Sequence, residues 1–375
     1  MTESRAALIA LASLRAMTPR RLHIMLARHS AIETLHRLRS GIAFDAEVEP
    51  AELREMFGAL REQAKIVDAD QVVARCDSVG VSIITREDRV YPRLLVHDPF
   101  PPAVLFVRGC VDPLALRSVS IVGTRNATAA GRATAFELGE ALSSAGLAIV
   151  SGLARGIDGA AHRGVRAAGG HAIGVVGNGV DAPYPKQNAD IWQWVGDNGL
   201  LMSEWPPGTP PGDFHFPLRN RVIAALGDVL VVVESRESGG SLITAKAAAE
   251  RGVTVMAVPG SIRHPAAGGT NKLISEGAIP VTCVDDVFVA LGLDHSRDAG
   301  RSTIDRPIDA VSADVLELCI AAPRTIDVIV GALGIPVPDA AVALSRLEQL
   351  GLVVATGGWF ESTQSRLSGS KVAQS

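Results

Sequence analysis

Cysteine is scarce in this chain, and the few cysteines lie far apart. The 375 residues contain four, with no Cys-x-x-Cys pair among them. A disulfide framework or a structural zinc site needs cysteines at close and regular spacing, so the sequence argues against both. We expect reduced thiols, as in a cytoplasmic protein, and no metal site. The four positions are Cys76, Cys110, Cys283 and Cys319.

Long apolar runs and an excess of positive charge are also missing. No run approaches the ~20 apolar residues of a membrane span. The apolar stretch 6–14 is interrupted by Arg15, which argues against a signal peptide. We expect a soluble cytoplasmic protein without a membrane partner. Because the net charge is −4, a site for a polyanion has to come from basic residues that cluster locally.

The signatures of two nucleotide-binding enzyme classes are absent. A dinucleotide site needs Gly-x-Gly-x-x-Gly after the first strand, whereas this chain has Gly123-Thr124-Arg125 without that spacing. A phosphate-binding loop needs Gly-Lys followed by Ser or Thr, and that triplet does not occur. We therefore expect no cofactor.

What the chain does have is a regular alternation of apolar runs with helical segments. Continuous apolar runs are typical of strands buried on both faces, and the helices between them form parallel crossovers. The predicted fold is a doubly wound, mostly parallel α/β sheet, to which Val104–Val107 adds an edge strand and in which Val281 begins a seventh apolar run. The other six central runs are 119–122, 147–150, 172–176, 200–202, 229–233 and 253–258.

A small helical domain is predicted in front of this sheet, over residues 1–75. Thr18 and Pro19 are the N-cap and first residue of one of its helices. The sheet domain itself is predicted to cover 76–292. A linker rich in Asp, Arg and Ser follows at 293–307.

A second small module is predicted behind the linker. Residues 308–362 have the order of three helices and a strand pair, which suits a winged helix, and a tail follows at 363–375. The module carries seven acidic residues against two basic ones, Arg324 and Arg346. Since acidic residues repel phosphate, we do not expect the main polyanion site in this module.

The stretch from Ser151 to His162 is a strand-to-helix turn within the predicted sheet. Asp158 is placed to cap the helix that follows, and His162 lies one turn later on the same face. Two interpretations are open. In one, glycines shape the turn and His162 pairs with Asp158 for structural reasons. In the other, the turn presents Arg155 and bare N–H groups to an anion at the carboxyl edge of the sheet.

Basic residues follow the strands at this same edge, where doubly wound sheets bind their ligands. Acidic residues such as Glu137 and Asp190 fall on helices instead. This segregation predicts a positive rim, with phenylalanines available to stack on bases. The candidate binding residues are Arg125, Arg155, Lys186, Arg219 and Arg221, with Gly123, Thr124 and Asn220 beside them and Phe214 and Phe216 for stacking.

The glycine-rich stretch 238–244 follows a strand and opens a helix, a place where a hydrolase would hold a nucleophilic serine. No nearby motif supplies a base and a residue to orient that base. A helix-capping role for Ser241 or Thr244 is therefore favoured, and we assign no catalytic residue.

Taken together, these stretches resemble the DNA-processing protein A family, also called DprA or Smf. The matching motifs follow one another in the family's order from about Tyr91 to Gly292. They are Ile121-Val122-Gly123-Thr124-Arg125, Ser151 to Asp158 with Ala161-His162, Gly177 to Asp181 with Tyr184-Pro185, Phe216-Pro217 with Arg219-Asn220-Arg221, Ser238 to Ala245, Val258-Pro259-Gly260 and Gly277-Ala278.

The resemblance implies an extended Rossmann-like domain that binds single-stranded DNA, forms a homodimer and is not an enzyme. It further implies a recombination mediator that loads RecA recombinase onto strands coated with single-strand-binding protein, in DNA processing during natural transformation. The family's DNA-contacting arginine and lysine fall on Arg125 and Lys186. The flanking modules resemble a sterile-alpha-motif-like domain in front and a winged helix behind.

Two other classes of protein stay open at this point. A Rossmann-like nucleotide hydrolase of the lysine-decarboxylase-like group carries Pro-Gly-Gly-x-Gly-Thr followed by a catalytic glutamate. The stretch 238–244 reads Ser241-Leu242 at the second Gly-Thr step, and no acid follows before Glu250. A protein-interaction scaffold, the other class, would not need a basic rim.

Overall fold

The computed structural model describes residues 1–42, 44, 51–293, 309–349, 352–356 and 358–362. These residues belong to two compact units, Met1–Thr282 and Cys283–Ser375. Apart from residue 293, the predicted linker lies outside the described residues, and the predicted tail at 363–375 lies outside them entirely.

The N-terminal part of the first unit consists of helices around a small apolar core. The Thr18 side chain accepts a hydrogen bond from the Arg21 N–H and Pro19 lies in the first turn, so the predicted helix start is confirmed. Leu11 and Leu38 are fully buried at the centre. The helices are α1 (Glu3–Ala12), α2 (Pro19–Leu26), α3 (Ala31–Ser40), α4 (Ala51–Ile66) and α5 (Ala69–Ser78).

Side-chain contacts join these helices to the sheet that follows. Arg5 on α1 donates to Asp88 Oδ2 at 2.6 Å and to the Ile83 carbonyl at 2.8 Å. The ring of His23 on α2 meets the ring of Phe100 edge-on, with 4.6 Å between centroids. The helical part is therefore fastened to the sheet through the first strand and the segment between the first two strands.

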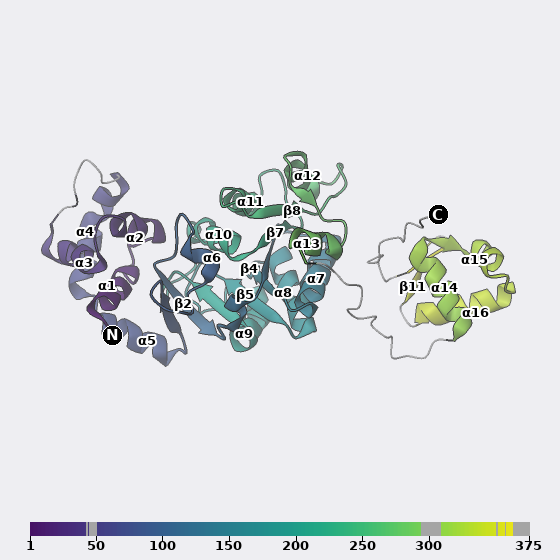
Figure 1. Cartoon of the computed structure of the whole chain (residues 1–375), viewed down its shortest axis with the longest axis horizontal. Helices are drawn as coiled ribbons and strands as arrows, with labels where there is room; N and C mark the ends of the chain where they lie inside the picture. Colours follow the sequence, from purple (N-terminus) through teal and green to yellow (C-terminus); the bar gives the residue numbers. More distant parts are fainter. Residues whose placement is uncertain (43, 45–50, 294–308, 350–351, 357, 363–375) are drawn as a thin grey trace. The chain divides into compact units, whose positions relative to one another are not determined.

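The rest of the first unit is built on one nine-stranded sheet (Figure 1). Its order is β1-β2-β6-β5-β4-β3-β7-β8-β9, in which the strands from β6 to β9 pair in parallel and β1 and β2 pair antiparallel. The strands are β1 (Ser82–Thr85), β2 (Val104–Gly109), β3 (Ser118–Val122), β4 (Ala148–Ser151), β5 (His171–Val175), β6 (Leu200–Ser203), β7 (Val229–Val232), β8 (Thr254–Ala257) and β9 (Ile279–Pro280).

The predicted doubly wound, mostly parallel Rossmann-like sheet is confirmed, and its six central runs all form strands. The prediction that Val104–Val107 forms the edge is wrong. β2 lies inside the sheet because the short run Ser82–Thr85 pairs with its free side and becomes the edge strand itself. A seventh parallel strand forms at Ile279–Pro280, just before Val281, and pairs with β8 as the other edge of the sheet.

Helices cover both faces of the sheet. Those on one face pack against one another from α7 to α9, and those on the other pack around α10 (Figure 1). The first group is α7 (Ala129–Ser144), α8 (Ile157–Ala168) and α9 (Ala189–Asn198), and the second is α6 (Arg93–Val96), α10 (His215–Leu226) and α11 (Ser241–Ala249). α12 (Gly268–Ser275) packs beside β8, and single 3₁₀ turns are η1 (Asp112–Ala115), η2 (Lys186–Asn188) and η3 (Pro265–Ala267).

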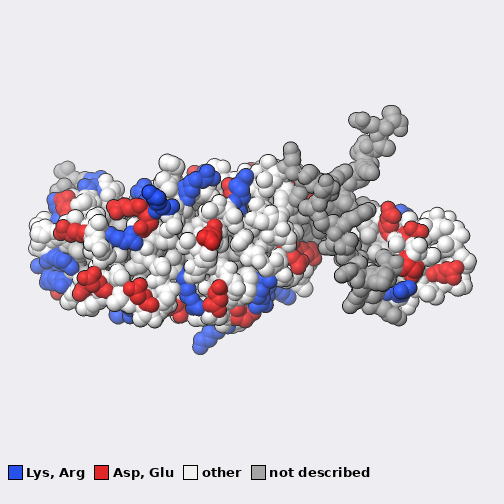
Figure 2. All heavy atoms as spheres, turned by 60° about the horizontal axis from the view of Figure 1, so that its bottom comes forward, with Lys and Arg blue, Asp and Glu red and all other residues white. Residues whose placement is uncertain are grey.

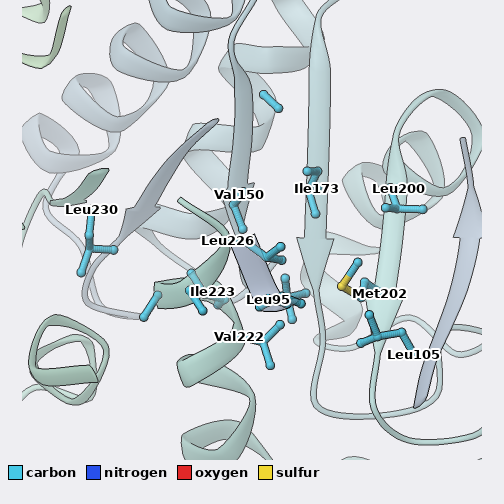
Figure 3. Packing of buried hydrophobic residues seen from close by; sticks show 14 of the residues in the cluster. Leu95, Leu105, Val150, Ile173, Leu200, Met202, Val222, Ile223, Leu226 and Leu230 are labelled. Atoms are coloured by element: carbon cyan, nitrogen blue, oxygen red, sulfur yellow. The ribbon is translucent and has the colours of Figure 1, made fainter. Parts of the chain in front are cut away.

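Figure 3 shows the core between the sheet and α10. Val150 and Ile173 from the sheet belong to the same buried cluster as Val222, Ile223 and Leu226 of the helix. Burying one such side chain contributes roughly 1.5–3 kcal/mol. α10 is buried along most of its length, so polar side chains on it need partners inside the protein.

The direction of the winding reverses at β3. The chain runs outward from β3 through β4 and β5 to β6, returns to the other side of β3 at β7, and continues to β8. The carboxyl ends of β3 and β7 therefore flank the switch point, where open α/β sheets bind ligands.

The second unit has its own core, which includes Leu316, Ile329 and Leu344. This unit contains a three-stranded sheet of order β10-β12-β11. The sequence predicts the strand pair β11 and β12 but not the short strand β10. The winged-helix interpretation stays a prediction. The elements are α13 (Val284–Ala290), α14 (Ala310–Ala321), β10 (Arg324–Thr325), α15 (Ile326–Leu333), α16 (Val337–Gln349), β11 (Val353–Thr356) and β12 (Trp359–Ser362).

No single helix among the described residues has both the length and the apolar composition to cross a bilayer. One pair bent by 117°, Ile326–Leu333 with Val337–Glu348, meets these requirements on length and composition only.

Candidate nucleic-acid interface

Two loops at the carboxyl edge of the sheet touch each other directly. The loop after β3 carries Arg125, and the loop after β4 carries Arg155. A Cβ atom on Gly123 would lie 2.4 Å from Ile157 Cγ1, and one on Gly156 would lie 2.3 Å from the Thr124 carbonyl oxygen. Gly156 also has a φ of 77°, which side chains rarely tolerate. Glycine at both positions lets the loops come close and places the two arginines in neighbouring loops.

A third loop is fastened to this pair by Asn188. The buried Asn188 amide donates to the carbonyls of Leu153 at 3.0 Å and Ala154 at 2.8 Å. Lys186 lies two residues before Asn188 in the 3₁₀ turn η2 and is exposed. The hydrogen bonds therefore bring the Lys186 turn next to the Arg155 loop, although the two are about thirty positions apart in the chain.

An aromatic stack lies beside these basic residues. The rings of Tyr184 and Phe216 are stacked with 5.6 Å between centroids and 20° between planes. The Arg125 guanidinium carbon lies 4.8 Å from the Phe216 centroid, in a cation–π contact. Phe214 is 59% exposed and Tyr184 is 39% exposed. Tyr184 was not among the candidate stacking residues, although it belongs to the Tyr-Pro motif in the sequence.

Arg125, Arg155 and Lys186 are exposed, and among the described residues none of them has an ion-pair partner. The basic residues of the nearby helix α8 differ, because Asp190 pairs with both Arg163, at 2.9 Å, and Arg166, at 3.2 Å. Elsewhere acidic and basic residues are interspersed, as the face in Figure 2 shows. The three unpaired side chains are thus available to bind phosphates.

Arg219 does not belong to the exposed rim that the sequence predicted. It is buried, and its Nη1 donates to the Gly152 carbonyl at 2.8 Å and also to the Val175 carbonyl. Burial lowers the pKa of Arg219 to about 10, so the guanidinium stays charged near neutral pH. Arg219 ties the ends of β4 and β5 together beneath the rim. Asn220, its neighbour, is half-buried.

Arg221 is also a correction to the predicted rim. Its buried guanidinium pairs with Glu204 at 2.5 Å, donates to the Phe100 carbonyl at 2.7 Å, and lies 3.9 Å from the centroid of the Phe100 ring. Burial raises the pKa of Glu204, and the Arg221 charge opposes that rise. Both arginines face inward because the helix that carries them is packed into the core.

The Ser151–His162 turn differs from its prediction in two respects. α8 begins at Ile157 with Gly156 as N-cap, so Asp158 is not the cap. Its buried carboxylate instead accepts a hydrogen bond from the Gly152 N–H at 3.1 Å, which joins the two ends of the turn. His162 forms no hydrogen bond with Asp158, and burial lowers the pKa of His162 to about 4, so its ring is neutral near pH 7.

The stretch 238–244 contains no arrangement typical of a hydrolase. Ser241 is buried, and its hydroxyl donates to Ser235 Oγ at 2.9 Å rather than to a base. The predicted capping role is wrong as well, because α11 begins at Ser241 after Gly240 and no side chain caps it. Within the described parts of the chain, no cluster of His, Cys, Asp or Glu could hold a metal ion.

Comparison with known proteins identifies the family. Residues 82–292 match the family described as DNA recombination-mediator protein A. The chain is 41% identical over 222 residues to DNA processing protein DprA of Bacillus subtilis, covering 59% of this chain and 75% of that protein. It is 33% identical over 291 residues to protein Smf of Escherichia coli, covering 74% of this chain and 76% of that protein.

Solved structures agree with these matches. The X-ray structure of DNA processing protein A from Streptococcus pneumoniae has a TM-score of 0.62 and 30% identity, covering 77% of this chain and 98% of that one. The structure from Helicobacter pylori, which concerns the unique single-stranded DNA binding mode of that protein, has a TM-score of 0.51 and 26% identity, covering 56% and 95%. The chain described here therefore belongs to the DNA-processing protein A family, DprA or Smf.

Proposed function

We propose that this protein binds single-stranded DNA along the carboxyl edge of its sheet. The observation that carries the proposal is the contact of the Arg125 guanidinium with the Tyr184–Phe216 stack. It places a free positive charge beside exposed aromatic surface, the combination by which proteins hold a single strand. Arg125, Arg155 and Lys186 bind phosphates, while Tyr184, Phe214 and Phe216 offer ring surface to bases.

The arrangement favours a single strand over a duplex. Stacking on an aromatic side chain needs a base whose face is free, and in a duplex both faces are covered by neighbouring base pairs. Gly123 and Thr124 contribute backbone that lets the Arg125 loop lie close to its neighbours. The Helicobacter pylori relative, for which single-stranded DNA binding is described, supports the same assignment here.

The proposal extends to a role in recombination. We infer that the protein, as a homodimer in the cytoplasm, loads RecA recombinase onto strands coated with single-strand-binding protein, in DNA processing during natural transformation. The family description as a recombination mediator supports this role. Its assay is the rate of RecA filament growth on coated strands, with and without the protein.

A nucleotide hydrolase of the lysine-decarboxylase-like group is the alternative, and no observation favours it. Ser241, the residue that would serve as nucleophile, is buried and donates a hydrogen bond to the Ser235 hydroxyl. We therefore propose that the protein is not an enzyme and needs no cofactor.

Fluorescence polarisation with a labelled single strand, a duplex of the same length and free deoxynucleotides tests the proposal. We expect the single strand to bind at least tenfold more tightly than the duplex, a difference of about 1.4 kcal/mol. Deoxynucleoside monophosphates should not compete, and chromatography should recover them intact. Equal affinity for all three ligands, or nucleotide cleavage that Ser241→Ala abolishes, would contradict the proposal.

Removal of the acidic C-terminal module should leave this binding nearly unchanged. The basic residues and aromatic rings of the proposed site all lie between Arg125 and Phe216. A chain ending near Asp305 should therefore bind a single strand within about threefold of the full chain, measured by the same polarisation assay. A loss of tenfold or more, about 1.4 kcal/mol, would show that the module contributes directly to the DNA site.

A further inference from the structure

Glu234, the second residue after β7, is not one of the proposed DNA-binding residues, but its side chain makes two hydrogen bonds to Thr128. Its Oε2 accepts from the Thr128 N–H at 2.9 Å, and its Oε1 accepts from the Thr128 hydroxyl at 2.5 Å. A Cβ atom on Gly131 would lie only 2.3 Å from the Glu234 carboxyl carbon. The carboxylate is therefore seated directly on the first turn of α7.

The start of α7 is the place where a fold of this kind can bind an anion. α7 follows β3 at the switch point of the sheet, and the free N–H groups of such a helix start attract negative charge. In this protein the negative charge comes from the chain itself. Thr128, the N-cap, also accepts from the Gly131 N–H at 2.9 Å, so the helix start is already supplied with acceptors.

The backbone of Glu234 holds the opposite end of the same loop. The Thr124 N–H donates to the Glu234 carbonyl at 2.8 Å. The loop from Thr124 to Thr128 is thus fixed at both ends by one residue, through its carbonyl at one end and its carboxylate at the other. Arg125 lies inside this span, is exposed, and has no ion-pair partner within the described part of the chain.

We propose that Glu234 is a positioning residue for Arg125. Through its hydrogen bonds to Thr128 at one end and Thr124 at the other, Glu234 holds the 124–128 loop in the shape that presents Arg125 to a DNA strand and keeps Arg125 over Phe216. This inference rests on the proposed single-stranded DNA binding. It assigns to Glu234 no contact with DNA, and its carboxylate acts only through the loop.

Three substitutions distinguish the effect of the length of the Glu234 side chain from the effect of its charge. Glu234→Ala removes the carboxylate and with it both side-chain hydrogen bonds to Thr128. Glu234→Asp keeps the charge but shortens the side chain by one methylene. Glu234→Gln loses the charge but keeps an acceptor for the Thr128 N–H. If positioning is the role, Glu234→Ala and Glu234→Asp should each weaken single-strand binding by about fivefold, the worth of one phosphate contact at about 0.1 M salt. Glu234→Gln should stay within twofold of the unchanged protein.

If Glu234 acts through its charge alone, the three variants should rank differently in their affinity for a single strand. Removing a negative charge near the strand would then tighten binding in both Glu234→Ala and Glu234→Gln, and Glu234→Asp would have no effect. That result, or unchanged affinity in Glu234→Ala and Glu234→Asp alike, would overturn the inference. Thermal unfolding of each variant identifies those that are folded at the assay temperature. Glu234→Asp, the smallest change, serves as the test should Glu234→Ala not fold.

A double-mutant cycle with Arg125→Ala distinguishes positioning from a general loss of structure. Once Arg125 is absent, the shape of its loop no longer matters, so adding Glu234→Asp should cost no further affinity. An equal loss in both backgrounds would show that Glu234 acts elsewhere. If Arg125→Ala alone leaves affinity unchanged, the proposed function fails. If Arg125→Ala weakens binding and Glu234→Asp does not, only the inference about Glu234 fails.

Discussion

Replacing Arg125 and Lys186 together by alanine should weaken single-stranded DNA binding about 25-fold at about 0.1 M salt. Each phosphate bound by a single strand adds about 0.7 to the slope of log K against log salt, which is worth about fivefold at that concentration. Loss of both contacts should therefore flatten the slope by about 1.4 for strands of any sequence. Polarisation titrations at several salt concentrations give both quantities.

The folded structure should not change in this variant. Both side chains are exposed and have no ion-pair partner among the described residues, and exposed charges of this kind contribute little to stability. A control is Arg20→Ala with Lys65→Ala, which removes the same charge from exposed residues on α2 and α4. If the control flattens the salt slope as much as the test variant does, the binding is nonspecific and the rim is not the site.

Replacing Arg221 by alanine should lower the free energy of unfolding by about 3–5 kcal/mol, because it leaves Glu204 buried without its charged partner. Glu204 is 5% exposed at its side chain, and Arg221 also holds the Phe100 carbonyl and packs on its ring. With Arg221 gone, Glu204 should take up a proton, since burial already raises its pKa. Urea unfolding followed by circular dichroism measures the loss of stability.

The appropriate control is Arg236→Ala, the same substitution at an exposed arginine. It should change the free energy of unfolding by no more than about 0.5 kcal/mol. Combining Arg221→Ala with Glu204→Gln should recover part of the loss, because glutamine is neutral and is buried without having to take up a proton. A loss below about 1 kcal/mol in Arg221→Ala would show that the pair is solvated rather than buried.

Glu234 and Tyr184 illustrate what a linear reading of the chain could not find. Glu234 lies 106 positions from the Thr128 residue it holds, and nothing near it in the sequence indicates a partner. Tyr184 belongs to the Tyr-Pro motif of the sequence, but only the folded structure stacks its ring on Phe216. Both residues depend on crossovers that bring separate loops to one edge.

The apolar runs alone determined the doubly wound sheet, because a strand buried on both faces has to be apolar throughout, whatever its neighbours are. The ends of the same apolar runs locate the carboxyl edge and the loops that carry Arg125, Arg155 and Lys186. Only the tertiary structure decided which basic residues face solvent. Arg219 and Arg221 follow the same edge in sequence, yet they lie on a helix packed between the sheet and its neighbours. Their direction is set by that packing, since a charged side chain on a buried helix has to find its partners inside the protein.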